Sequence, residues 1–159
     1  MTIKVGDRIP ESTLTTMGEK GPLPLSTSEI FDGKKVVLFS VPGAFTPTCS
    51  AKHLPGFVEN ADNIFAKGID TIACMAVNDV FVMNAWGKSA EAKKLLMLAD
   101  GNGEFSVQLG LELDARAFGM GQRSQRFALI AEDGVVTQLF VEGPGEYSVS
   151  SAEHILSNL

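Results

Sequence analysis

The chain has 159 residues, of which 45% are hydrophobic and 20% are charged, and its formal net charge is −6. A chain of this size and composition can bury a sizeable core, so we expect residues 1–159 to form one globular domain. The acidic balance, without any lysine- or arginine-rich run, argues against a nucleic-acid-binding protein and against binding to anionic membranes.

Three further features bear on the cellular compartment. No apolar run reaches the roughly 18 residues of a membrane span. The N-terminal residues lack the apolar core and cleavage site of a secretory signal peptide. The two cysteines, Cys49 and Cys74, are too few for a disulfide scaffold. We therefore expect a cytoplasmic protein, in which a prominent cysteine is either core filler or a reactive group.

The first half of the chain predicts short strands and turns, followed by buried strands that alternate with helices. Frequent Gly, Pro, Ser and Thr residues before residue 35 favour turns and short strands. The apolar runs 36–41 and 69–77 predict two buried strands. Asn78-Asp79 can then cap a helix that continues to about Ser89.

Between these two strands the sequence predicts a long helix with an irregularity. It should begin at Pro47 and run to about Lys67, where Gly68 can supply a left-handed C-cap. Pro55 removes one hydrogen bond inside this helix and clashes with the preceding turn, so we expect a kink near Leu54.

The second half predicts a short strand over 95–99, a short helix over 104–109 and a hairpin. The hairpin joins the apolar runs 127–131 and 135–141 through an Asp-Gly turn, which is a strong hairpin signal. Ser150, with Glu153 three residues later, forms a capping box for a terminal helix. This order of elements predicts an α/β fold with a central mixed β-sheet flanked by helices.

The segment Pro42–Cys49 joins the first strong strand to the long helix and carries the clearest chemical signal. Thr46 can cap the helix by accepting a backbone N–H, and Pro47 suits the first helical position. Cys49 then falls in the first turn, where free N–H groups and the helix dipole favour an anion. Because the thiolate is the reactive form of cysteine, this position predicts a nucleophile.

A reactive cysteine at this point, within this order of elements, resembles the thioredoxin-like fold. Thioredoxins carry Cys-x-x-Cys there, whereas this chain has Thr46-Pro47-Thr48-Cys49. Thr46 replaces the first cysteine, so exchange within one motif is impossible and the thiol must be regenerated from outside. Pro42, Thr46 and Cys49 together resemble the peroxiredoxin signature Pro-x-x-x-Thr-x-x-Cys.

The resemblance extends over nearly the whole chain and is closest to the type II (atypical), peroxiredoxin-five-like subgroup. The similar blocks occur in the same order as in that subgroup: 41–50, 52–57, 72–74, 77–82, 85–87, 123–127 and 133–134. One short motif could arise by chance, but several blocks in the right order are specific.

The resemblance implies roles for four residues. Cys49 is the peroxidatic nucleophile, Thr46 hydrogen-bonds its thiolate and the incoming peroxide, and Pro42 walls the pocket. A guanidinium is also required, because it stays charged and can hold peroxide oxygens with its fork of donors. Arg126, which directly precedes an apolar strand, occupies the catalytic position of the family; Arg123 is the second candidate.

Cys74 leaves two interpretations open. It lies on an apolar strand, so the simpler one is a small buried core residue. Members of the subgroup with this spacing suggest a resolving thiol instead, although a disulfide needs Cα atoms within about 7 Å. Other members place a resolving cysteine near the C-terminus, but residues 146–150 contain none. We favour a resolving thiol from another molecule.

We therefore expect a thiol-specific peroxidase that reduces hydrogen peroxide and alkyl hydroperoxides through a sulfenic acid on Cys49. The implied reductant is glutaredoxin with glutathione, or thioredoxin, and the implied assembly is a homodimer. No metal, haem or flavin is expected. The alternatives are a cysteine-dependent hydrolase or transferase that uses Cys49 with His53, four residues later, and a non-catalytic redox sensor with a thioredoxin-like fold.

Overall fold

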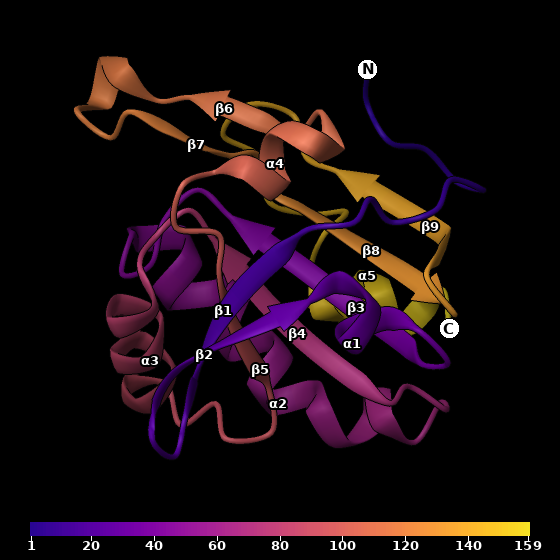
Figure 1. Ribbon diagram of the computed structural model, residues 1–159. Helices are drawn as coiled ribbons and strands as arrows, with labels where there is room; N and C mark the ends of the chain where they lie inside the picture. The colour runs from indigo at the N-terminus through magenta and orange to yellow at the C-terminus, as the bar shows by residue number, and fades with distance from the viewer.

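The computed structural model describes residues 1–159 and has the alternating strands and helices that the sequence predicts (Figure 1). The strands are β1 (Thr13–Gly18), β2 (Gly21–Ser26), β3 (Lys35–Val41), β4 (Thr71–Ala76), β5 (Leu96–Ala99), β6 (Glu112–Asp114), β7 (Gln122–Ser124), β8 (Phe127–Glu132) and β9 (Val135–Val141). The helices are α1 (Thr27–Phe31), the π-helix η1 (Cys49–His53), α2 (Leu54–Phe65), α3 (Val80–Ser89), α4 (Glu104–Leu109), the 3₁₀-helix η2 (Arg116–Phe118) and α5 (Ala152–Ser157).

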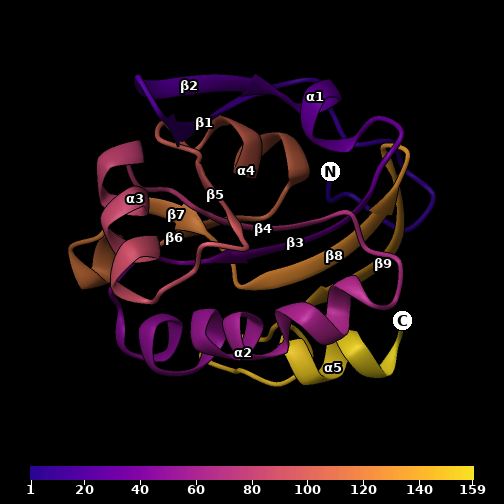
Figure 2. The same cartoon turned by 90° about the horizontal axis from the view of Figure 1, so that it is seen from below.

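Seven strands form one mixed sheet in the order β2-β1-β5-β4-β3-β8-β9. The central strands β3, β4 and β5 run parallel, whereas β8 and β9 add antiparallel strands at one side. In Figure 2, α2 and α5 lie along one face of the sheet, and α1 and α4 lie on the other. This arrangement confirms the expected thioredoxin-like α/β fold. None of the helices combines the length and the apolar character that a membrane span requires.

Alternating side chains of the central strands fill two separate cores. Val37, Phe39 and Val41 of β3 face the core that α2, α3 and α5 cover, whereas Val36 and Leu38 face the core under α1 and α4. Side chains alternate across a strand, so an uninterrupted apolar run is what a strand buried on both faces needs. The first of these cores also contains Cys49, at the start of η1.

The long helix has the predicted break, but its form differs from a simple kink. The helical stretch begins at Pro47 and becomes the π-helix η1, in which the N–H of Leu54 donates to the carbonyl of Cys49. The α-helical pattern then starts at Leu54, with Pro55 in its first turn, where no N–H is needed. The widened turn therefore takes up the irregularity that Pro55 imposes.

The Asp-Gly hairpin is confirmed, because Asp133 and Gly134 both have positive φ angles, of 51° and 78°. The predicted cap of the terminal helix was wrong by one residue. Ser151 caps α5 by accepting the N–H of His154, whereas the hydroxyl of Ser150 is buried and donates to Glu142. The β6–β7 ribbon, which Figure 1 shows projecting beyond the main sheet, was not predicted because its strands are three residues each.

Candidate active site

The turn after β3 is held tightly against neighbouring segments. Asn78, which the sequence suggested as a helix cap, accepts the N–H of Ala44 at 2.9 Å, while Asp79 caps α3. A Cβ on Gly43 would lie 3.2 Å from side-chain atoms of Arg123, Met120 and Thr46, so a larger residue would require these side chains to shift by a few tenths of an ångström. Phe45 adopts a left-handed φ of 64°, which is strained for a residue with a side chain.

Thr46 does not cap the helix in the predicted way. Its hydroxyl donates to the carbonyl of Gly43 at 2.7 Å and accepts no backbone N–H of the first turn. A hydroxyl has a single proton, so while this bond closes the turn, Thr46 cannot donate a hydrogen bond to any other group. Pro42 lies half-buried at the end of β3.

Cys49 is fully buried, and its sulfur meets a guanidinium. Arg126 directly precedes β8, and its Nη2 atom lies 3.0 Å from the Sγ of Cys49. These residues are 77 positions apart in sequence and meet because β3 and β8 are neighbours in the sheet. The guanidinium therefore places a permanent positive charge and a hydrogen-bond donor directly beside this buried sulfur.

The second arm of the Arg126 guanidinium binds His53. Nη1 of Arg126 lies 2.8 Å from Nδ1 of His53, and Nε2 of the same ring lies 2.9 Å from the carbonyl oxygen of Ser150. A guanidinium only donates and a carbonyl only accepts, so His53 carries its proton on Nε2 and accepts at Nδ1. Burial, followed by the charge of Arg126, lowers the pKa of His53 to about 3, so the ring is neutral.

This geometry removes His53 as a general base for Cys49. The only lone pair of the neutral ring faces Arg126, and its proton is directed at a backbone carbonyl. The Cys–His dyad that a hydrolase or transferase would use is therefore not formed here, and His53 instead orients Arg126.

Tyr147, from the segment between β9 and α5, covers the Arg126–His53 pair. Its ring packs edge-on against His53 at 5.2 Å between centroids and lies 6.0 Å from the guanidinium carbon of Arg126. The hydroxyl of Tyr147 donates to the carbonyl of Lys52 at 3.3 Å. This aromatic side chain therefore packs over both the charged guanidinium and the neutral imidazole ring.

The two remaining candidates, Cys74 and Arg123, do not contact the Cys49 sulfur. Cys74 is a free, fully buried thiol in the middle of β4, paired with Phe39 of β3 and Met97 of β5. Burial, and then the nearby Cys49, raises the pKa of the Cys74 thiol well above its ordinary value. The guanidinium of Arg123 instead donates to the carbonyls of Met120 and Val77.

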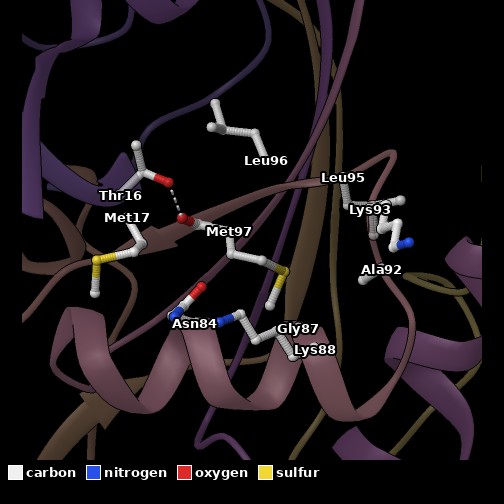
Figure 3. A pocket seen from close by; sticks show the side chains of 10 residues that line it. All are labelled: Thr16, Met17, Asn84, Gly87, Lys88, Ala92, Lys93, Leu95, Leu96 and Met97. Atoms are coloured by element: carbon white, nitrogen blue, oxygen red, sulfur yellow. Dashed lines mark hydrogen bonds between the residues drawn. The ribbon is translucent and has the colours of Figure 1, made fainter. Parts of the chain in front are cut away.

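A separate hollow of about 290 Å³ lies between α3, β5 and β1 (Figure 3). Met17 and Met97 line it, and the hydroxyl of Thr16 donates to the Met97 carbonyl at 2.7 Å across it. Its other polar side chains are Asn84, Lys88 and Lys93. Neither a cysteine nor a histidine lines it, and it is separate from the residues around Cys49.

Sequence reasoning missed three contributors to this site: Asn78, Tyr147 and Glu142. Glu142 follows β9 and holds the segment that carries Ser150, by accepting the Ser150 N–H and hydroxyl at 2.8 and 2.7 Å. The sequence held a weak signal for Glu142, because this acid directly follows an apolar strand. A carboxylate buried at such a position needs partners. Nothing in the sequence could reveal which side chains those partners are.

Comparison with known proteins gives consistent matches over the full chain. The family model described as Redoxin matches residues 4–156. Peroxiredoxin-2B of Arabidopsis thaliana is 52% identical over 159 residues, which cover 99% of this chain and 98% of that protein. Hybrid peroxiredoxin hyPrx5 of Haemophilus influenzae is 40% identical over 162 residues, covering 100% of this chain and 67% of that protein.

Solved structures match equally well. Reduced Prx3 from Vibrio vulnificus in complex with H2O2 superposes with a TM-score of 0.96 at 52% identity, covering 99% of both chains. The antioxidant protein of Plasmodium falciparum, a 1-Cys peroxiredoxin, superposes with a TM-score of 0.91 at 32% identity, covering 99% of this chain and 100% of that one.

Proposed function

This chain belongs to the peroxiredoxin family and is a thiol peroxidase, and from that premise we propose that Cys49 is its peroxidatic nucleophile and Arg126 its catalytic guanidinium. The observation that carries the proposal is the 3.0 Å contact between Arg126 Nη2 and the buried sulfur of Cys49. The hydrogen peroxide held by the Vibrio vulnificus relative supports a peroxide as the substrate.

The reaction is an attack of the Cys49 thiolate on the terminal oxygen of a hydroperoxide. A sulfur–oxygen bond forms, the O–O bond breaks, and the departing oxygen takes a proton to leave as water or an alcohol. Cys49 is oxidised to a sulfenic acid. Negative charge moves from sulfur to the departing oxygen during this step, so a fixed guanidinium lowers the barrier by stabilising that charge.

Thr46 and Pro42 have supporting roles in this proposal. Thr46 stands three residues before Cys49, and its oxygen retains lone pairs while its proton is bound by the Gly43 carbonyl. It can therefore accept a hydrogen bond from the peroxide, and it can donate to sulfur only after leaving Gly43. Pro42, half-buried beside the same turn, limits access of water to the thiolate.

The sulfenic acid is reduced by an external thiol, from glutaredoxin with glutathione or from thioredoxin. The external sulfur displaces water from the sulfenic acid and forms a mixed disulfide, which a second thiol then reduces to restore Cys49. Support comes from Cys74, which is fully buried at the centre of β4 and would have to leave the sheet to form a bond. The 1-Cys relative from Plasmodium falciparum supports the same scheme.

We also propose that the protein forms a homodimer and that it works in a reducing compartment such as the cytoplasm. Phe45, in the turn after β3, and Phe81, in the first turn of α3, expose 53% and 64% of their surface, which is unusual for phenylalanine in an isolated subunit.

Both cysteines are free, as expected where thiols stay reduced. Two relatives at 50% identity are chloroplastic, so the compartment is tested by locating the protein in its own cell.

The experiment that tests the role of Cys49 is single-turnover oxidation of Cys49→Ser beside Cys74→Ala. Trp86, the sole tryptophan, donates to the Ser50 hydroxyl at 2.9 Å and therefore reports on the residue next to Cys49. We expect wild type and Cys74→Ala to consume one equivalent of peroxide in a rapid fluorescence phase, and Cys49→Ser to show none. Peroxide turnover by Cys49→Ser would overturn the proposal.

A further inference from the structure

Glu142 is a buried carboxylate whose partners all belong to the segment that covers the active site. It is 6% exposed and directly follows β9. Its Oε2 atom accepts three hydrogen bonds, from the N–H of Ser148 at 2.7 Å, the N–H of Ser150 at 2.8 Å and the Ser150 hydroxyl at 2.7 Å. Its Oε1 atom is buried without a hydrogen-bond partner. Such an arrangement needs an explanation beyond packing.

Glu142 stands at the beginning of a continuous hydrogen-bonded chain that ends at the reactive sulfur. Ser150, held by Glu142, offers its carbonyl to Nε2 of His53 at 2.9 Å. His53 accepts Nη1 of Arg126 at 2.8 Å, and Nη2 of Arg126 reaches the Cys49 sulfur at 3.0 Å. The backbone N–H of Glu142 also donates to the carbonyl of Arg126 at 3.0 Å, so the same residue fixes both ends of Arg126.

We propose that Glu142 is a positioning residue for peroxide reduction: by anchoring Ser150 it fixes His53, and through His53 it sets the direction in which Arg126 presents its guanidinium to Cys49. This inference rests on the proposed role of Cys49. It assigns Glu142 no contact with the peroxide.

The covering segment depends on this anchor because it has little else to hold it. It begins with Gly143, Pro144 and Gly145, of which Gly145 has a φ of 72°, and glycines leave a backbone free to move. Apart from its bonds to Glu142 and the Ser150–His53 bond, its hydrogen bond to the rest of the fold is that of the Tyr147 hydroxyl to the Lys52 carbonyl, at 3.3 Å, although the Tyr147 ring also packs on His53 and Arg126. A bond of that length is weak.

The charge of Glu142 is kept at neutral pH. Burial by itself raises the pKa of Glu142, but hydrogen bonds from Ser150 and Ser148 outweigh it and hold that pKa below its ordinary value. An ionised carboxylate accepts hydrogen bonds about twice as strong as those of a neutral group, which suits an anchor. The charged and titratable groups facing it are Arg126 and His53, through Ser150, and the phenol of Tyr147.

The test compares Glu142→Ala and Glu142→Gln with the control Glu146→Gln. Glu146 is an exposed acid of the same segment whose side chain makes no hydrogen bond, so the control removes the same charge without the anchor. Two measurements are needed: iodoacetamide alkylation of Cys49 against pH, quantified on the Cys49 peptide by mass spectrometry, and ¹⁵N NMR of the His53 ring.

We expect Glu142→Ala to slow peroxide oxidation of Cys49 about tenfold, to raise the midpoint pH of its alkylation and to abolish the fixed Nε2-protonated signal of His53, because small misplacements of a catalytic group are costly. Glu142→Gln keeps one acceptor oxygen and should recover part of each effect. Glu146→Gln should behave as wild type.

A purely structural role predicts a different pattern. If a folded Glu142→Ala lost thermal stability but kept the wild-type alkylation midpoint and His53 signal, the proposal would be wrong. If Glu142→Ala does not fold, the same two measurements on Glu142→Gln decide the question. Neither readout uses peroxide turnover, so a failure of the Cys49 assignment would be seen separately, in Cys49→Ser.

Discussion

The guanidinium of Arg126 divides its donors between two buried partners, with Nη2 at 3.0 Å from the sulfur of Cys49 and Nη1 at 2.8 Å from Nδ1 of His53. One planar group therefore holds the nucleophile and is itself held in place. The fixed fork of Arg can make both bonds at once, whereas a lysine ammonium is a single point charge on a flexible stem. The geometry of Arg126 and the burial of Cys74 lead to four predictions.

The first prediction concerns the fork of Arg126. Arg126→Lys keeps the positive charge but cannot reach both Cys49 and His53, so peroxide reduction should fall by about 10²–10³-fold, the range for removing one preorganised donor. Stopped-flow oxidation followed by Trp86 fluorescence measures this. Arg116→Lys, on an exposed ion pair with Asp114 of the β6–β7 ribbon, is the matched control and should oxidise at the wild-type rate. A full rate in Arg126→Lys would show that charge alone suffices.

The second prediction separates a positioning histidine from a general base. His53→Gln can still donate to the Ser150 carbonyl and accept from Arg126, so it should keep peroxide reduction within a few-fold of wild type, whereas His53→Ala should lose about tenfold. Rates over a range of pH give the readout. If His53→Gln were as slow as His53→Ala, and both lost a pH-dependent phase, His53 would have to exchange a proton during the reaction.

The third prediction concerns stability against acid. Burial, and then Arg126, lowers the pKa of His53 from 6.5 to about 3, so between these values the unfolded chain binds more protons than the folded one. The free energy of unfolding therefore decreases as pH falls from 6.5 toward 3, by up to roughly 5 kcal/mol for this group. Denaturant unfolding at about pH 7 and about pH 4.5 measures the loss.

The control for this experiment is the other histidine. His53→Gln cannot gain this proton on unfolding, so it should lose about 2–3 kcal/mol less than wild type between the two pH values. His154→Gln, on the partly exposed side of α5, should keep the wild-type loss. Equal losses in wild type and His53→Gln would contradict a depressed pKa for His53.

The fourth prediction concerns the second cysteine. Cys74 lies in register with Phe39 and Met97 at the centre of the sheet, and its thiol is fully buried. After one equivalent of peroxide, intact-mass spectrometry should therefore show a gain of one oxygen on Cys49 or a mixed disulfide with added glutathione. Cys74→Ala should turn over with external thiols as wild type does. A Cys49–Cys74 disulfide in wild type would mean that β4 or η1 unfolds locally during each cycle.

The local elements followed closely from local chemistry. The Asp133-Gly134 turn, the Asp79 cap and the break before Pro55 each depend on one or two residues whose backbone preferences hold in any context. The errors arose where a tertiary partner competed. Thr46 donates to the Gly43 carbonyl instead of capping a helix, and the Ser150 hydroxyl donates to Glu142 instead of capping α5.

The sequence by itself determined the α/β class, the buried strand 36–41 and the placing of Cys49 at the start of a helix, because periodicity and caps are short-range properties. It could nominate Arg126 only through a resemblance, since spacing along the chain does not choose among four arginines. The tertiary structure alone decided that Arg126 meets Cys49, that His53 is neutral with its two ring nitrogens bound to Arg126 and Ser150, and that Glu142 anchors Ser150. Each of these depends on contacts between distant segments, which the pairing of β3 with β8 and of β8 with β9 brings together.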